Sequence, residues 1–175
     1  MSLIDSFLVW WLKAGRYKWS WLRRRLCERR YLRIALPTVN SLEEVENCLR
    51  QVTWTMDGPL HLFDSISYPQ TVWAKKKDDC DGFAILAAEL LKRLAPNYKP
   101  LLITAMVRPI RASHTVCAFS STQGSIWFFD NRVLRRGNWQ TYDDVATEIS
   151  KPPLRLVCWD VRNPTTLEMI EFHAL

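Results

Sequence analysis

Three side chains of the sequence have the chemical types that a thiol-dependent acyl-transfer enzyme needs. Cys80 offers a sulfur nucleophile, His114 a base, and Asp130 a carboxylate that can orient the imidazole. Each of these residue types more often has a structural role, since free cysteines are commonly buried in cores. Their order along the chain, on a predicted helix followed by two predicted strands, supplies the parts of a catalytic triad.

The segment around Cys80 predicts a helix that opens at Asp79 and ends near Leu94, before Pro96. Its apolar positions recur at helical spacing: Phe83, Leu86, Ala87, Leu90 and Leu94. The unpaired N–H groups of a first turn, together with the helix dipole, favour the thiolate form of a cysteine there. The charged neighbours conflict, and the sequence leaves open which set lies nearer the sulfur: Asp78, Asp79 and Asp81 against Lys75, Lys76 and Lys77.

The strands that would carry His114 and Asp130 are predicted to pair as a hairpin. The two strand segments and the loop between them are 113–119, 125–130 and 120–124. If Phe119 lies opposite Ser125, then His114 lies opposite Asp130 on the same face, with Cβ atoms about 5 Å apart. A slip of one residue would place the two side chains on opposite faces of the sheet.

Four short motifs surround these residues. They are Asp79-Cys80-Asp81-Gly82-Phe83-Ala84, the upstream Trp54-Thr55-Met56-Asp57 with Asp64 and Pro69, and the downstream Ser113-His114-Thr115-Val116 and Trp127-Phe128-Phe129-Asp130-Asn131. Taken together, they make the chain from about residue 42 to 135 resemble the bacterial transglutaminase-like cysteine proteinases of the transglutaminase-like superfamily.

The resemblance implies a papain-like α+β fold, with Cys80 as nucleophile, His114 as general base and acid, and Asp130 as its orienter. It also implies acyl chemistry on an amide or isopeptide bond. Two positions depart from the family pattern. Asp78 stands where the family often has glycine, and Gly82 stands where many members have a second acidic residue. Neither departure removes a catalytic atom.

The oxyanion of such a reaction would be held by the backbone N–H of Cys80 and by one further donor. Trp73 is a candidate for that donor, because an indole N–H can only donate, although core packing is the favoured interpretation of this residue. The same three residues serve whether water or an amine accepts the acyl group. The sequence lacks a glycine-rich phosphate loop and local pairs of metal ligands, so no cofactor and no metal is predicted.

The rest of the pattern predicts helices first and mostly adjacent strands later, which indicates an α+β fold with an antiparallel sheet. A basic helical arm over residues 1–36, capped by Ser2 and interrupted by Gly15, is expected to precede a catalytic domain over residues 37–175. The further elements expected in that domain are a helix capped by Ser41, an irregular stretch over 59–78, strands over 101–107 and 154–159, and a short helix over 142–149.

The basicity of the chain belongs to the arm. Residues 1–36 carry nine Lys/Arg and two Asp/Glu, a net charge of +7, whereas residues 37–175 carry a net of −1. The arm also holds several aromatic residues: Trp10, Trp11, Tyr17, Trp19, Trp21 and Tyr31. Three interpretations compete. In the first, the arm packs its aromatic stripe on the body and leaves the arginines in water. In the second, it lies on an anionic membrane surface. In the third, it binds the phosphates of nucleic acid or an acidic partner.

The cysteine pattern bears on the compartment. Five cysteines at long intervals, without a C-x-x-C pair, predict reduced thiols and a cytoplasmic location. No apolar run approaches ~18 residues, so no spanning helix is predicted. The N-terminal stretch also lacks the pattern of a secretory signal.

These observations predict a cysteine peptidase or amidase that cleaves a peptide or isopeptide bond of a protein or peptide substrate. A transglutaminase that cross-links or deamidates proteins would use the same three residues. Two other classes stay open. One is a catalytically silent version of the fold that binds a peptide or partner, and the other is a binding protein that acts through its basic arm.

Overall fold

The core of the structure is a six-stranded antiparallel sheet. The computed structural model describes residues 2–56, 65–121 and 124–175. In spatial order, the strands of the sheet are β6 (Val133–Trp139), β5 (Ile126–Asp130), β4 (His114–Ser120), β3 (Leu101–Arg108), β7 (Arg155–Arg162) and β8 (Met169–Ala174). A separate short parallel ladder joins β1 (Thr53–Trp54) to β2 (Lys77–Asp78).

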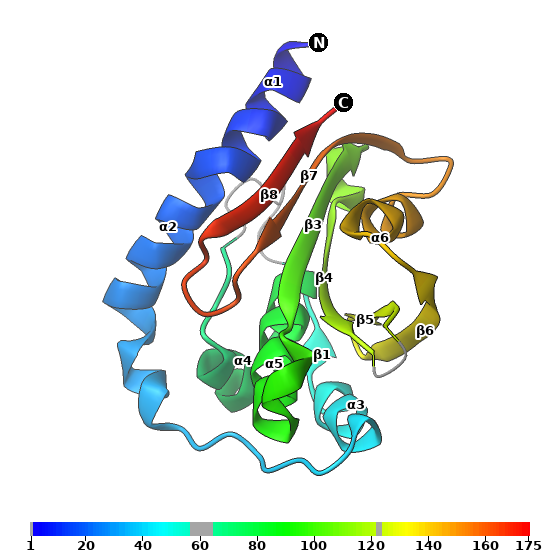
Figure 1. Cartoon of the computed structure of the whole chain (residues 1–175). Helices are drawn as coiled ribbons and strands as arrows, with labels where there is room; N and C mark the ends of the chain where they lie inside the picture. Colours follow the sequence, from blue (N-terminus) through cyan, green and yellow to red (C-terminus); the bar gives the residue numbers. More distant parts are fainter. Residues whose placement is uncertain (1, 57–64, 122–123) are drawn as a thin grey trace.

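Helices cover both faces of this sheet (Figure 1). The arm runs through α1 (Leu3–Trp10), a π-helical turn (Trp11–Gly15), α2 (Arg16–Arg23), a second π-helical turn (Arg24–Glu28) and a 3-10 turn (Arg29–Arg33). The other helices are α3 (Leu42–Arg50), α4 (Pro69–Lys75), α5 (Cys80–Leu94) and α6 (Tyr142–Ile149), with 3-10 turns at Pro96–Tyr98 and Ile110–Ala112. Among the described residues, no helix is both long and apolar enough to cross a bilayer.

Alternate side chains of the strands serve two separate cores. On one face, residues such as Leu102 and Phe129 pack against α5 and the arm. On the other face, residues such as Ile103 and Phe128 pack against α6. This two-residue alternation between faces is the normal consequence of strand geometry. The predicted α+β class with an antiparallel sheet is confirmed.

The helix starts that the sequence predicts are found in the structure. Asp79 caps α5, because its carboxylate accepts the backbone N–H of Asp81 at 3.0 Å. Ser41 caps α3 in the same way, through the N–H of Glu44 at 3.2 Å. These signals are local, since a capping side chain acts on a backbone group two or three residues away. The sequence alone therefore locates them.

The register of β4 and β5 differs from the predicted one by two residues. Phe119 pairs with Trp127, where the prediction placed it opposite Ser125. His114 and Asp130 are consequently not directly opposite one another. They remain on the same face, because a shift of two residues preserves the side of the sheet to which every side chain points.

Several elements of the structure were not predicted, among them β6, β8, α4 and the short strands β1 and β2. The strands β6 and β8 lie at the two edges of the sheet and carry charged residues, as edge strands commonly do. Their apolar alternation is correspondingly weak. The helix α4 falls within the stretch 59–78 that was expected to be irregular; it has seven residues and begins with Pro69. The motif residues Asp57 and Asp64 lie outside the described residues.

The arm stays helical through Gly15, so the predicted interruption there is wrong. Ser2 caps its first helix as expected, with Asp5 completing a capping box. A Cβ atom at position 15 would lie 2.5 Å from the ring of Trp11. Glycine therefore lets this ring pack against the backbone of the arm, and does not end the helix.

Every fourth residue of the arm faces the body of the protein. The buried positions in this series are Leu8, Leu12, Arg16, Ser20, Arg24 and Glu28. A helix with 3.6 residues per turn drifts away from a four-residue repeat. The two π-helical turns are wider and compensate for this drift, which keeps one face of the arm against the body along its whole length.

The expectation that the arm packs by an aromatic stripe and leaves its arginines in water is only partly right. Trp11 and Tyr17 are buried as expected. However, the arm also buries Arg16 and Arg24, and its other tryptophans, Trp10, Trp19 and Trp21, are exposed.

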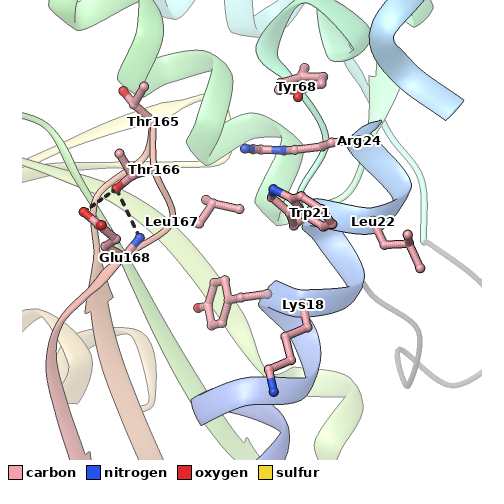
Figure 2. A pocket seen from close by; sticks show the side chains of 10 residues that line it. Lys18, Trp21, Leu22, Arg24, Tyr68, Thr165, Thr166, Leu167 and Glu168 are labelled. Carbon is pink, nitrogen blue, oxygen red and sulfur yellow. Dashed lines mark hydrogen bonds between the residues drawn. The ribbon is translucent and has the colours of Figure 1, made fainter. Parts of the chain in front are cut away.

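Beside α2, the surface is hollowed into a pocket of about 590 Å³, which Figure 2 shows between the arm and residues 165–168.

Candidate active site

Cys80 is the first residue of α5, and only 7% of its surface is exposed. Its backbone N–H lies in the first turn of the helix, where no preceding turn supplies a carbonyl partner. The positive end of the helix dipole is directed at the same place. The position is therefore suited to hold negative charge on the sulfur or on an oxyanion beside it.

His114 and Asp130 form a close polar pair. The distance from His114 Nε2 to Asp130 Oδ1 is 2.8 Å, and both side chains are about three-quarters buried. This hydrogen bond holds the pKa of Asp130 below its usual value, against the effect of partial burial, and the guanidinium of Arg135 at 3.4 Å acts in the same direction. Asp130 is thus a carboxylate at neutral pH. It fixes one nitrogen of the imidazole and leaves Nδ1 as the nitrogen that can exchange a proton with a substrate or a thiol.

Cys80 and His114 line the same small cavity. Its volume is about 20 Å³, which is room for about one water molecule. The other lining residues come from the arm, from β3 and from the segment before β4: Trp11, Arg16, Thr104, Met106, Ile110, Ser113 and Thr115. The structure therefore brings together the predicted thiol and imidazole, with Asp130 hydrogen-bonded to the latter.

The acidic and the basic neighbours of Cys80 differ in burial, and this difference decides which of them act on its sulfur. The carboxylates of Asp79 and Asp81 and the thiol of Cys80 have ligand atoms within 4.8 Å of one another, and both aspartates are buried. The side chains of Lys75 and Lys77 lie at the surface. The acidic set is thus the nearer one, and it disfavours a thiolate unless it is compensated.

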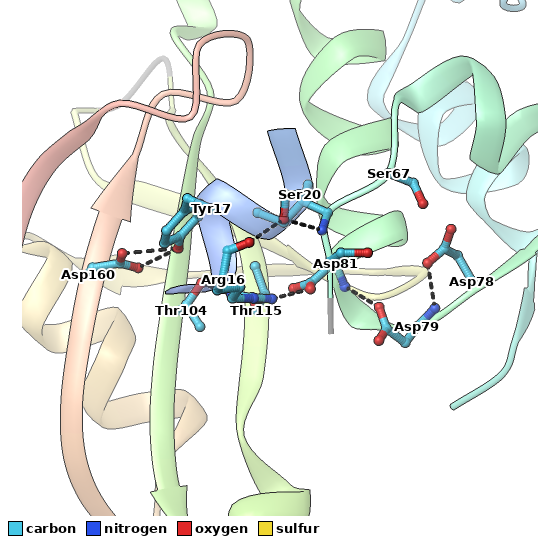
Figure 3. A network of polar contacts seen from close by, with 12 residues as sticks. Arg16, Tyr17, Ser20, Ser67, Asp78, Asp79, Asp81, Thr104, Thr115 and Asp160 are labelled. Carbon is cyan, nitrogen blue, oxygen red and sulfur yellow. Dashed lines mark hydrogen bonds and ion pairs between the residues drawn. The ribbon is translucent and has the colours of Figure 1, made fainter. Parts of the chain in front are cut away.

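Arg16 of the arm supplies a positive charge that compensates the aspartates beside Cys80. This role was not predicted from the sequence. The guanidinium of Arg16 forms an ion pair with Asp81 and donates to the hydroxyls of Thr104 at 3.1 Å and Thr115 at 3.3 Å (Figure 3). The side chain is 1% exposed. A cation from the N-terminal arm therefore lies in the wall of the cavity that holds Cys80. The four-residue spacing of polar residues at 16, 20, 24 and 28 was the signal that could have indicated a polar buried face.

Asp78 and Gly82 are the two departures from the family pattern. Side chains at both positions would overlap. A Cβ atom at position 82 would lie 2.2 Å from Cβ of Asp78 and 2.3 Å from its Cγ. The carboxylate of Asp78 accepts the backbone N–H of Asp79 at 3.0 Å. An acidic side chain at 78 thus requires glycine at 82, and the two departures form a single structural change.

Trp73, the candidate for the second oxyanion donor, lies in α4 and packs against the larger hydrophobic core. The ammonium group of Lys76 lies 2.7 Å from the centre of its indole ring. Trp73 is not among the residues that line the cavity with Cys80 and His114. This placement matches the core-packing interpretation.

Within the described residues, Asp79, Cys80 and Asp81 form a group of side chains with the ligand types of a metal site. The three are consecutive in sequence, and Asp81 already pairs with Arg16. The guanidinium occupies the place of a compensating cation. None of the five cysteines, all of which lie in the described residues, forms a disulfide bond, and Cys27 is the exposed one.

Comparisons with known proteins give a structural likeness. No family model matches the chain, and no curated protein matches it. Among the solved structures, the chain is similar to Legionella pneumophila LapG (EGTA-treated), with 16% sequence identity and a TM-score of 0.47. The likeness covers 76% of this chain and 69% of LapG.

Proposed function

We propose that this chain is a thiol-dependent acyl-transfer enzyme, a cysteine peptidase or amidase with Cys80 as its nucleophile. The observation that carries the proposal is the shared cavity of Cys80 and His114, with the imidazole held by Asp130 at 2.8 Å. Nucleophile, base and orienting carboxylate are the three roles of a thiol triad.

In the proposed reaction, Cys80 gives its thiol proton to Nδ1 of His114, and the resulting thiolate attacks the carbonyl carbon of an amide to form a tetrahedral intermediate. The backbone N–H of Cys80, in the first turn of α5, is one donor to its oxyanion. His114 then gives a proton to the leaving amine, and Asp130 stabilises the charged imidazole before that transfer. Water completes hydrolysis, while an amine in its place completes a transglutaminase-type transfer.

Substrate access requires a movement at the arm. The cavity of about 20 Å³ admits water but no peptide, and Trp11 and Arg16 form part of its wall. Arg16 is held in this wall by an ion pair and two hydrogen bonds, and the Trp11 ring packs against Gly15 and in the larger core, so widening the cavity would displace part of the arm. The small cavity also favours a second candidate function, a catalytically silent fold that binds a partner elsewhere.

Alkylation by a small reagent such as iodoacetamide, followed cysteine by cysteine by mass spectrometry as a function of pH, separates the two candidates. Cys48 is the matched control, because it is 8% exposed against 7% for Cys80, and burial raises the pKa of its thiol. For an activated nucleophile, we expect Cys80 to react at least about tenfold faster than Cys48 at neutral pH, with an apparent pKa below ~8.5.

The variant His114→Ala should remove this advantage without changing the labelling of Cys48. Equal rates for Cys80 and Cys48 in the unaltered protein would contradict the proposal and favour the silent fold. A fast Cys80 that is indifferent to His114→Ala would contradict the assignment of His114 as the base.

A further inference from the structure

The arm leaves much of its apolar surface uncovered. On α1, the exposed large side chains are Leu3, Ile4, Phe7 and Trp10. Along α2 and the turn after it, they are Trp19, Trp21, Leu22 and Leu26. Trp10 is 56% exposed and Trp21 is 58% exposed. We call these eight residues the outer face of the arm.

The exposure follows from what the arm buries. Its inner face is fixed by polar contacts to the body, such as Arg16 with Asp81 and Glu28 with the backbone N–H of Tyr68 at 2.8 Å. Arg24 donates to the carbonyls of Ile66 and Ser67. The inner face holds these polar residues together with four apolar ones, Leu8, Trp11, Leu12 and Tyr17, and the residues of the outer face point to solvent. Clusters of exposed large apolar groups, here one on α1 and one on α2 and the turn after it, mark interaction surfaces.

Exposed basic side chains lie among the residues of the outer face. Lys18, Arg25 and Arg29 are exposed, and the guanidinium of Arg25 lies 5.2 Å from the ring centre of Trp21. The described acidic residues of the arm, Asp5 and Glu28, are both buried in polar contacts with the body. The solvent side of the arm therefore presents positive charge together with aromatic and aliphatic groups.

The pocket beside α2 adjoins this face. Trp21 and Leu22 belong both to the outer face and to the lining of the pocket, and Lys18 and Arg24 also line it (Figure 2). The pocket has a volume of about 590 Å³. It is separate from the cavity of Cys80, since the two share no lining residue. The pocket thus joins apolar groups to Lys18 and Arg24 on the side of the arm, with Glu168 on the opposite side.

We propose that the outer face of the arm binds the surface of an anionic lipid bilayer. Tryptophan suits the boundary between headgroups and acyl chains, leucine and phenylalanine suit the acyl region, and lysine and arginine suit anionic headgroups. Nucleic acid offers no comparable place for the aliphatic residues Leu3, Ile4 and Leu26. A second copy of the chain would bring two arms of net charge +7 together, and this charge opposes self-association.

The test is co-sedimentation of the full-length protein with vesicles of phosphatidylcholine alone or of phosphatidylcholine with phosphatidylglycerol. We expect binding to the anionic vesicles that weakens as salt is added, because the charged part of the attraction is screened. The variant Arg25→Glu/Arg29→Glu should lower the partition coefficient at least about tenfold. The variant Trp10→Ser/Trp21→Ser should also lower it, at unchanged net charge.

Matched controls lie elsewhere on the surface. Lys99→Glu/Arg111→Glu makes the same change in net charge at two exposed positions outside the arm, and Trp54→Ser removes an exposed tryptophan from β1. Both controls should keep the binding of the unaltered protein. Near-ultraviolet circular dichroism of every variant verifies that the fold is retained.

Several outcomes would overturn the proposal. One is equal loss of binding in the arm variants and in the controls, which would indicate a non-specific charge effect. Another is absence of binding to the anionic vesicles together with salt-sensitive binding to a DNA or RNA duplex, which would assign the arm to nucleic acid. A third is absence of vesicle binding together with a dimer that Trp10→Ser/Trp21→Ser dissociates.

Discussion

Asp78 and Gly82 show how single residues set the first turn of α5. The side chain of Asp78 fills the volume beside Gly82 and accepts the backbone N–H of Asp79, which in turn caps the helix. Cys80 lies between these groups along the chain, so its position depends on the packing of Asp78 against Gly82.

We expect Gly82→Ala to destabilise the protein by about 1–3 kcal/mol, because its Cβ would overlap Asp78 in a fully buried turn. This sign is opposite to that of an ordinary helical Gly→Ala change, which stabilises by about 1 kcal/mol. Equilibrium unfolding in urea measures both the single variant and Asp78→Gly/Gly82→Ala. The double variant should recover part of the loss, with a coupling of about 1 kcal/mol or more. Strict additivity of Asp78→Gly and Gly82→Ala would show that the two positions do not share their space.

At the scale of elements, the arm is a helix built around a four-residue repeat. The π-helical turns at 11–15 and 24–28 keep its polar inner face on the body, and this face binds both α5 and the segment that leads into α4. Ser20 accepts the backbone N–H of Ile66 at 2.9 Å. The arm thus positions two of the elements that surround Cys80, and Arg16 connects it to the first turn of α5.

Replacing Arg16 by methionine should destabilise the protein by about 3–5 kcal/mol. The change leaves the buried Asp81 without its guanidinium, and breaking one side of a buried ion pair exposes the full cost of the remaining charge. Urea unfolding at neutral pH is the measurement. Arg25→Met, at an exposed position of the same arm, is the control and should stay within about 0.5 kcal/mol of the unaltered protein. Similar losses for the two variants would contradict the role assigned to Arg16.

On the scale of the whole molecule, the arm and the body share one hydrophobic core. Leu8, Trp11, Leu12 and Tyr17 belong to the same buried cluster as the apolar residues of α5 and of one face of the sheet. Tyr17 also donates its hydroxyl to the buried carboxylate of Asp160 in β7 at 3.0 Å. The boundary at residue 36 therefore separates two parts of the sequence that are joined by extensive packing.

Deletion of residues 1–28 should abolish cooperative thermal unfolding, because it uncovers the core surface on α5 and the sheet and leaves Asp81 and Asp160 without their partners from the arm. Thermal unfolding monitored by circular dichroism, with binding of a hydrophobic dye as a second readout, measures the effect. Full-length Arg25→Glu/Arg29→Glu is the control and should unfold as the unaltered protein does. A deletion variant that unfolds cooperatively at the same temperature would show that the arm is a dispensable attachment. Surface variants of the arm are therefore the appropriate probes of its binding.

Much of the site follows from local patterns. The cap at Asp79, the helix that starts with Cys80 and the alternation that keeps His114 and Asp130 on one face all depend on residues within a few positions of one another. Edge strands escaped prediction because β6 and β8 bury little and so carry little apolar alternation. The register was wrong by two residues because loop composition does not fix the length of a turn.

The sequence by itself thus determined the fold class, the start of α5 and the face shared by the imidazole and the carboxylate, since capping and strand periodicity act over two to four residues. Only the tertiary structure decided that Arg16 enters the wall of the cavity, that the aspartates lie nearer to Cys80 than the lysines do, and that Asp78 excludes a side chain at 82. The ion pair that holds Arg16 in this wall joins it to Asp81, 65 positions further along the chain. Such contacts depend on how whole elements pack, and neither composition nor periodicity encodes which arginine of a basic helix meets a buried carboxylate.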